Sequence, residues 1–184
     1  NGGRAAKEYE QQDVLAKLAE KTNDWIRENA EIPFFSYLPL PSPHAPIVPS
    51  KGFEGKGLND YADFCIETDW VVGEVLKTLD EIGEVENTIV IFTADNGTAR
   101  FVDFEFMHNL GHYSSLHYRG MKGTLWEGGH RVPFVLRWPA KATAGAVCDE
   151  AICTTDLLAT CADLFKETLP ATEGGDSVSF LPAI

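Results

Sequence analysis

The sequence has few cysteines, few basic residues and no long apolar run. Its four cysteines form no Cys-x-x-Cys pair and lack zinc-ligand spacing, so they indicate no zinc site and do not decide the redox compartment. Lys and Arg number 15 against 28 Asp and Glu, a net charge of -13 that repels phosphate backbones and anionic lipid surfaces. No apolar run is long enough for a transmembrane helix, and no signal peptide is visible. We therefore expect neither a nucleic acid nor a membrane as partner.

What the sequence does contain is enough apolar material for a folded domain: 184 residues, of which 44% are hydrophobic. Apolar periodicity predicts helices over residues 13–28, 59–82 and 154–165, strands over 34–38, 88–93 and 132–138, and a short strand at 151–153. Strands that alternate with helices favour an α/β fold with a mainly parallel sheet flanked by helices.

The strand predicted at 88–93 is followed by Asp95, Asn96 and Gly97. Ligands of open α/β sheets gather beyond the carboxyl ends of the strands. A carboxylate beside a carboxamide offers hard oxygen atoms, which suit Ca²⁺ or Mg²⁺ better than Zn²⁺. The same residues also suit an Asx turn closed by Gly97, and their local spacing alone favours that turn.

His44 lies in a loop that contains four prolines within residues 39–46. Each proline fixes its own φ and restricts the residue before it, so the histidine is held on a stiff segment just past a predicted strand. Such a position suits chemistry, although the segment by itself is more typical of a surface-loop histidine.

Residues 96–131 contain no clear core strand or long helix, and a loop region of this length in a compact domain is usually functional. It holds four histidines and four cationic side chains: His108, His112, His117, His130, Arg100, Arg119, Lys122 and Arg131. In an acidic chain this concentration favours binding of an anion. The histidine spacing does not match a metalloprotease helix, so zinc is disfavoured here too.

Three segments, in chain order, resemble motifs of the type I, formylglycine-dependent sulfatases of the alkaline phosphatase superfamily. They are Pro-His-Ala-Pro at 43–46, Thr-Ala-Asp-Asn-Gly at 93–97, and Gly-Met-Lys-Gly-Thr-Leu-Trp-Glu-Gly-Gly-His-Arg-Val-Pro at 120–133. The resemblance covers most of the chain and implies an alkaline-phosphatase-like α/β catalytic domain. It also implies that residues 1–184 are a C-terminal fragment of that single domain, without its small C-terminal subdomain.

The resemblance implies roles for four residues. Asp95 and Asn96 would be ligands of a Ca²⁺ ion, with Mg²⁺ less favoured. His44 would contact the sulfate and help to protonate the leaving alcohol. Lys122 would hold a sulfate oxygen and offset negative charge on the bridging oxygen. Because sulfate transfer passes through a charge-rich transition state, fixed cations and a proton donor fit this chemistry.

Three further residues have weaker assignments. Arg131 would form an ion pair that supports the glycine-rich loop. His112 and His117 would either touch the organic part of the substrate or be ordinary surface histidines, and the sequence favours neither alternative.

The sequence departs from the family at the nucleophile. Sulfatases of this type oxidise the cysteine of Cys-x-Pro/Ala-x-Arg to formylglycine, and none of the four cysteines is followed by this pattern. We therefore expect the formylglycine in a missing N-terminal segment, and a chain that is inactive alone and prone to self-association. The whole protein would release sulfate from an aryl or carbohydrate sulfate ester, possible substrates including sulfated glycans, in a periplasmic or secreted location. The alternatives are a phosphoryl or phosphonate hydrolase of the same superfamily and a non-catalytic sulfated-glycan-binding relative.

Overall fold

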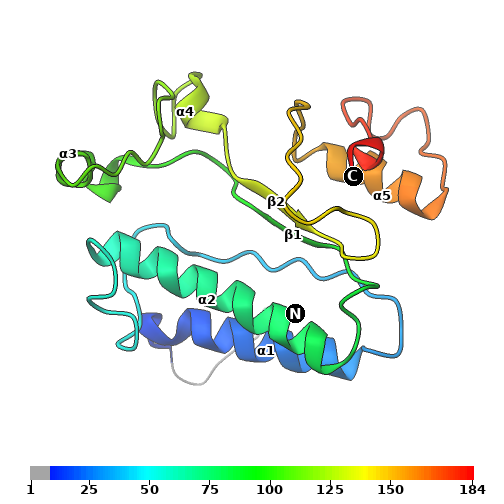
Figure 1. Ribbon diagram of the computed structural model, residues 1–184, viewed down its shortest axis with the longest axis horizontal. Coiled ribbons are helices and arrows are strands. Elements are labelled where there is room, and N and C mark those ends of the chain that lie inside the picture. The colour runs from blue at the N-terminus through cyan, green and yellow to red at the C-terminus, as the bar shows by residue number, and fades with distance from the viewer. Residues whose placement is uncertain (1–8) are drawn as a thin grey trace. The chain divides into compact units, whose positions relative to one another are not determined.

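The computed structural model describes residues 9–184, which divide into a first unit that ends at Val135 and a second unit, Leu136–Ile184. The helices are α1 (Val14–Glu28), α2 (Asp60–Glu81), α3 (Phe104–Asn109), α4 (Glu127–His130) and α5 (Asp156–Phe165), the strands are β1 (Val90–Thr93) and β2 (Phe134–Arg137), and short 3-10 turns lie at Gln11–Asp13, Arg100–Val102 and Leu181–Ala183 (Figure 1). No helix in this described part of the chain is long and apolar enough to cross a membrane.

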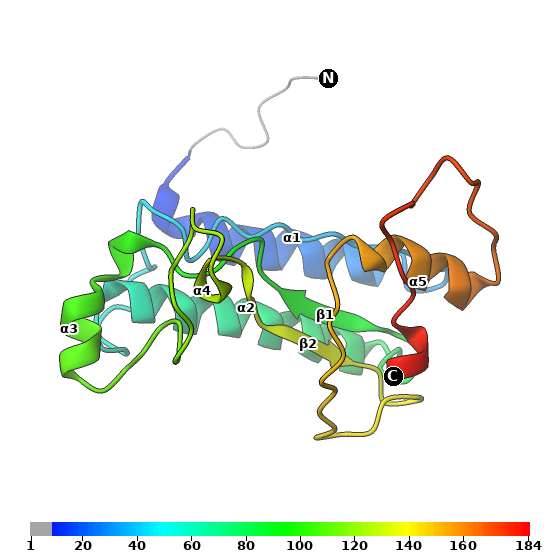
Figure 2. The ribbon, with the colours of Figure 1, turned by 90° about the horizontal axis from the view of Figure 1, so that it is seen from above.

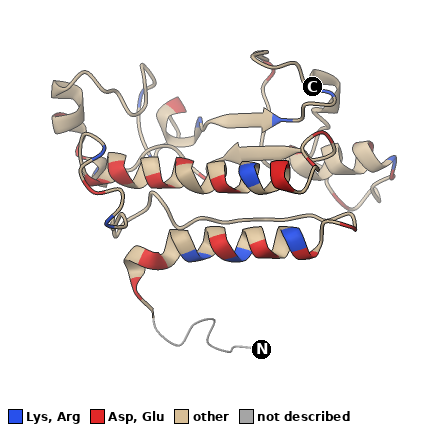
Figure 3. Cartoon of the chain, turned by 60° about the horizontal axis from the view of Figure 1, so that its bottom comes forward, with Lys and Arg blue, Asp and Glu red and all other residues tan. Residues whose placement is uncertain are grey.

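Helices α1 and α2 lie side by side and build the core of the first unit (Figure 3). Their buried contact consists of Leu15, Ala19, Phe64 and Val71. Figure 3 marks acidic residues along both helices, interspersed with a smaller number of Lys and Arg, in keeping with the net negative charge. Both helices agree with the predicted ranges because the apolar periodicity that produces them is a local property of the chain.

Helix α2 begins and ends with local signals. The Asn59 side chain accepts a hydrogen bond from the Ala62 backbone N–H at 2.9 Å, which satisfies one unpaired donor of the first turn. Gly83 follows the helix with φ +77°, a conformation that glycine adopts without steric cost. Glu67 is buried and accepts from the Ser50 N–H at 2.9 Å. This acid is structural, because it joins α2 to the segment after the His44 loop.

The prediction of a mainly parallel sheet is wrong for the described residues. Strands β1 and β2 form a two-stranded sheet and run in opposite directions (Figure 2). The strand predicted over 34–38 does not form, and Phe35 and Tyr37 are 81% and 79% exposed. A strand needs a neighbour to bond its N–H and C=O groups, and no described segment pairs with residues 34–38. Residues 34–38 have the apolar pattern of a strand, but they have no partner strand in the described part of the chain.

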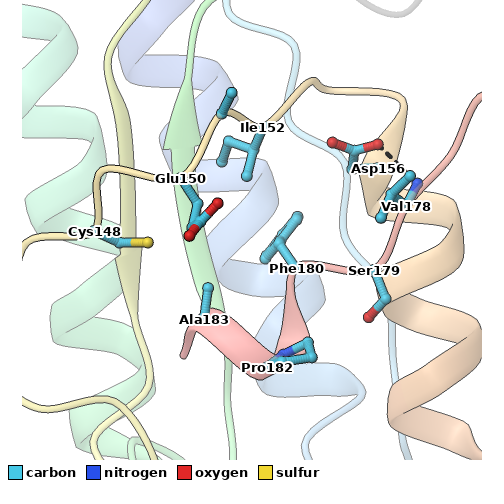
Figure 4. Close-up of a pocket in the computed structure, with 10 residues that line it drawn as sticks. Cys148, Glu150, Ile152, Asp156, Val178, Ser179, Phe180, Pro182 and Ala183 are labelled. Atoms are coloured by element: carbon cyan, nitrogen blue, oxygen red, sulfur yellow. Dashed lines mark hydrogen bonds between the residues drawn. The ribbon is translucent and has the colours of Figure 1, made fainter.

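The second unit is organised around Asp156 at the start of α5. Its carboxylate accepts from the Val178 N–H at 2.9 Å (Figure 4). It also accepts from the Cys153 N–H at 2.7 Å. These two hydrogen bonds lower the pKa of the Asp156 carboxyl below its usual range, because they favour the charged form. The strand predicted at 151–153 does not form. Asp156 instead holds this segment and the C-terminal segment against the helix.

Candidate functional site

The loop that follows β1 presents two side-chain oxygen groups. Asp95 is exposed, and its carboxylate has no hydrogen bond or ion pair within residues 9–184. The Asn96 Nδ2 donates to the Gly97 carbonyl at 3.0 Å, so its Oδ1 is left free. An Asx turn would need the Gly97 N–H for the Asp95 carboxylate, but Gly97 N donates to the Gly129 carbonyl at 2.9 Å. The turn alternative therefore lacks its defining hydrogen bond.

The glycine-rich motif packs directly on this loop. Besides the bond from Gly97 to Gly129, the Lys122 N–H donates to the Thr98 carbonyl at 2.8 Å. A Cβ atom at Gly97 would overlap the carbonyl oxygen of Gly128, so the two backbones approach more closely than any side chain would allow. These contacts bring Lys122 to the loop of Asp95 and Asn96, although 25 residues or more separate them in the sequence.

This close approach predicts that Gly97→Ala destabilises the folded protein. The added methyl group must push the two loops apart, and we expect a loss of about 3 kcal/mol or more in the free energy of unfolding. Gly73→Ala is the control, because Gly73 lies mid-helix in α2 with nothing within 4 Å of a new Cβ and should stabilise by roughly 0.5–1 kcal/mol. Denaturant titration of the whole protein measures both. Equal midpoints for the two variants would contradict the contact described here.

His44 is exposed, and its ring is oriented by its neighbours. The Nδ1 atom lies 2.7 Å from the Ala45 carbonyl oxygen, which can only accept, so Nδ1 carries the hydrogen and Nε2 is the atom left for a substrate. The ring also meets the Phe101 ring edge-on, with centroids 5.2 Å apart. Phe101 lies three residues beyond Thr98, so all three motifs meet at one loop.

Sequence reasoning missed Phe101. The available signal was an aromatic residue inside the functional loop region, just after the Asp-Asn-Gly motif. Phe101 contacts His44, which lies more than 50 residues earlier in the chain. Such a contact depends on the tertiary structure and cannot be predicted from a local sequence pattern.

Lys122 differs from the cationic side chains near it. Arg131 forms an ion pair with Glu127 at 2.8 Å, as the resemblance implied. Arg119 stacks on the Trp126 ring at 3.8 Å. Lys122 is half-buried, and its ammonium group has no hydrogen bond or ion pair among the described residues. A partly buried, unpaired cation favours an anionic ligand.

The structure does not join the other two predicted histidines to this site. His112 and His117 are both exposed, and the His117 ring stacks on Tyr118 with centroids 4.4 Å apart. In the described part of the chain no hydrogen bond or ring contact links either histidine to His44 or Lys122. Their role in substrate binding stays a prediction.

The side chains at the loop fit a hard cation in type, though not in number. Asp95 and the free Oδ1 of Asn96 are oxygen ligands of the kind that Ca²⁺ takes, but Ca²⁺ binds about six to eight oxygens. Residues 9–184 contain no cluster of three or more His, Cys, Asp or Glu able to hold a metal. Further oxygens would have to come from other groups.

A separate pocket lies in the second unit. Its volume is about 380 Å³, and Cys148, Glu150 and Phe180 are among its lining residues (Figure 4). None of the predicted site residues lines it. The Asp-Asn-Gly loop and its neighbours are therefore the candidate functional site.

Asp95 and Asn96 offer free side-chain oxygens, Lys122 an unpaired ammonium group and His44 an oriented ring, all on segments that contact one another in the described chain. A sequence model of the family described as Sulfatase matches residues 6–167. The chain belongs to the sulfatase family.

Similar proteins agree with this assignment. The chain is 36% identical over 185 residues to an N-acetylgalactosamine-6-O-sulfatase of Bacteroides thetaiotaomicron, a match that covers 98% of this chain and 36% of that protein. It is 33% identical over 178 residues to the steryl-sulfatase of Rattus norvegicus, covering 93% of this chain and 30% of the relative. The chain thus spans about a third of the length of these relatives.

Solved structures confirm the fold. A structure from work on glycosaminoglycan metabolism by Bacteroides thetaiotaomicron matches with a TM-score of 0.88 and 35% identity, over 94% of this chain and 37% of that chain. A sulfatase from Pseudoalteromonas matches with a TM-score of 0.78 and 26% identity, over 96% of this chain and 36% of that one. The structure matches sulfatase catalytic domains over about a third of their length, although the sheet in residues 9–184 has two strands.

Proposed function

We propose that the protein containing this chain is a sulfuric ester hydrolase that releases inorganic sulfate from an aryl or carbohydrate sulfate ester. The observation that carries the proposal is the backbone hydrogen bonding between the Asp-Asn-Gly loop and the Lys122 segment. The His44 ring contacts the same loop region, because it packs edge-on against the Phe101 ring. Membership of the sulfatase family supports the reaction type. A relative named as an N-acetylgalactosamine-6-O-sulfatase supports the carbohydrate class, and one named as an arylsulfatase supports the aryl class.

Lys122 and His44 have distinct chemical tasks in this proposal. The Lys122 ammonium binds a sulfate oxygen and offsets the negative charge that develops as the ester bond breaks. His44 in its protonated form gives the proton on Nε2 to the leaving alcohol oxygen. Because Nδ1–H stays bonded to the Ala45 carbonyl, the ring keeps its orientation before and after this transfer.

Asp95 and Asn96 would hold the cation of the site, Ca²⁺ in preference to Mg²⁺. When bound, the cation adds positive charge beside the sulfate oxygens. Asp95 contributes a negative charge to that cation and Asn96 only a neutral oxygen. Asn96 is oriented for the task because its Nδ2 is already bonded to the Gly97 carbonyl.

The nucleophile is proposed to lie outside these 184 residues. None of the four cysteines is followed by the formylglycine pattern. Cys65 on α2 is further disfavoured as a nucleophile, because burial raises the pKa of its thiol and less thiolate forms. A formylglycine on another segment of the whole protein would, in its hydrated form, supply the hydroxyl that attacks the sulfur while the S–O bond to the leaving alcohol breaks.

Asp95→Ala in the whole protein tests the proposal. The wild-type protein should hydrolyse 4-nitrophenyl sulfate and release sulfate, and the variant should lose both turnover and Ca²⁺ affinity. We expect the affinity to fall at least about tenfold, since even the outer partners of metal ligands cost about 10- to 100-fold. Calorimetric Ca²⁺ titration and ion chromatography of sulfate provide the two measurements.

Asp69→Ala is the matched control, because Asp69 is an exposed aspartate on α2 outside the site. It should leave Ca²⁺ affinity and turnover at the wild-type level. Absence of sulfate release by the wild-type protein would refute the proposed function. An Asp95→Ala protein that keeps its turnover and its Ca²⁺ affinity would refute Asp95 as the ligand.

A further inference from the structure

A pocket of about 300 Å³ lies in the first unit beside the candidate site. It is lined by Ile47, Asn59, Asp60, Tyr61 and Phe101. None of these residues is a proposed metal ligand, sulfate-binding group or proton donor. Phe101 links the pocket to the reaction centre, because its ring is 38% exposed and lies edge-on against His44.

The pocket offers a small and specific set of groups to a ligand. Asp60 is exposed, and its carboxylate has no hydrogen bond or ion pair within residues 9–184. The Asn59 amide is already used: Oδ1 accepts from Ala62 N at 2.9 Å and Nδ2 points to the Val102 carbonyl at 3.4 Å. The available groups are therefore a free carboxylate and the Phe101 ring, because the Tyr61 phenol already has side-chain hydrogen bonds with Cys65 and Thr98.

The Tyr61 phenol is neutral at any physiological pH. Burial, with the neighbouring Cys65 thiol as a smaller cause, raises its pKa to about 12. The pocket thus carries one negative charge, that of Asp60. The nearest acid on the same helix turn, Asp63, is buried and accepts hydrogen bonds from the Gly55 and Gly57 N–H groups. None of the described residues that line the pocket is cationic.

We propose that this pocket binds a neutral pyranose ring of the substrate, with Phe101 and Asp60 as residues that determine specificity. The inference rests on the proposed sulfatase function. If His44 protonates the leaving oxygen, the organic part of the ester must begin next to His44, and Phe101 is its immediate neighbour. One face of a pyranose presents C–H groups that pack on an aromatic ring, and its hydroxyls donate well to a free carboxylate.

Two other substrate types fit the same pocket less well. A steroid or a plain aryl group would cover the Asp60 carboxylate without offering it a hydrogen bond, which is costly. A sugar with a second sulfate or a carboxylate near this pocket would be repelled by Asp60, with no lining cation to compensate. The lining therefore favours a singly sulfated sugar whose pocket-bound ring is uncharged.

The test compares two substrates with the whole protein: a monosulfated N-acetylhexosamine and 4-nitrophenyl sulfate. Phe101→Ala and Asp60→Asn should each lower kcat/KM for the sugar sulfate about tenfold, mainly through KM, the size expected for one lost aromatic or charge-assisted contact. The loss on 4-nitrophenyl sulfate should be much smaller. Asp60→Asn should also reduce the preference for the monosulfated over a disulfated sugar.

Phe106→Ala is the matched control, since Phe106 is an exposed phenylalanine of α3 outside the pocket, 42% exposed against 38% for Phe101. It should resemble wild type on both substrates. Equal losses on the two substrates in Phe101→Ala would mean that Phe101 only supports His44, and would overturn the proposal. So would unchanged kinetics in both pocket variants.

Saturation-transfer NMR with unsulfated N-acetylhexosamine separates this proposal from the proposed function. Binding that is weakened in both pocket variants but not in Phe106→Ala supports the pocket even if the wild-type protein hydrolyses no sulfate ester. Absence of binding to the wild-type protein overturns the pocket proposal, while hydrolysis of 4-nitrophenyl sulfate would leave the sulfatase function standing.

Discussion

Lys122→Ala should lower kcat about a hundredfold or more while Ca²⁺ affinity stays close to the wild-type value. Removal of a single group that stabilises transition-state charge commonly costs this much. The Lys122 ammonium has no ion pair in the described chain, so its proposed task concerns the substrate and not the metal. A contact that strengthens as charge develops acts mainly on kcat and only weakly on KM.

Steady-state kinetics on 4-nitrophenyl sulfate and calorimetric Ca²⁺ titration test this result together. Lys141→Ala is the control, because Lys141 is an exposed lysine with no ion pair within residues 9–184, and it should behave as wild type. The backbone bond from Lys122 N to the Thr98 carbonyl persists in the alanine variant, so the loop should keep its structure. Loss of Ca²⁺ binding in Lys122→Ala would show that the division of roles is wrong.

His44→Ala should show the steepest dependence on the leaving group. For sulfates of poorly acidic alcohols we expect a loss of about 10²- to 10⁴-fold, the range typical of a missing general acid. For a sulfate of a strongly acidic phenol the loss should be small, because that leaving group departs without a proton. A plot of log kcat/KM against leaving-group acidity should therefore be steeper for the variant than for the wild type.

His44→Gln separates proton transfer from binding. A glutamine amide can donate a hydrogen bond to the ester oxygen but does not release a proton as an imidazolium does. We expect the glutamine variant to be as slow as the alanine variant on poor leaving groups. Recovery of activity by glutamine, or a parallel plot for wild type and variants, would assign His44 to sulfate binding alone.

The sequence alone was enough for features that are encoded locally. Helices α1 and α2 follow from apolar residues spaced by one helical turn, and α2 ends at Glu81, within one residue of the predicted end at 82. Residues 96–131 contain no strand and no long helix, as expected. The motifs also singled out Asp95, Asn96, His44 and Lys122 as candidates, because each motif is a short run of characteristic residues, and their roles stay predictions.

The sheet could not be predicted correctly from the same patterns. A strand forms only where another segment supplies the matching N–H and C=O groups, and that partner is distant in sequence. Residues 34–38 have the apolar composition of a buried strand, yet no described segment pairs with them. Strands β1 and β2 do pair, but in the antiparallel direction, which their sequences do not specify.

The arrangement of the candidate site was likewise decided by tertiary structure. The sequence supplied the chemical groups, but backbone contacts between distant loops, such as Lys122 N to the Thr98 carbonyl, bring them together. The approach is possible because Gly97 has no Cβ atom and the carbonyl oxygen of Gly128 occupies that space. No local sequence pattern predicts this contact. The contact of His44 with Phe101 is of the same kind. Residue type and spacing determined which groups are present, and packing of the loops determined which of them lie together.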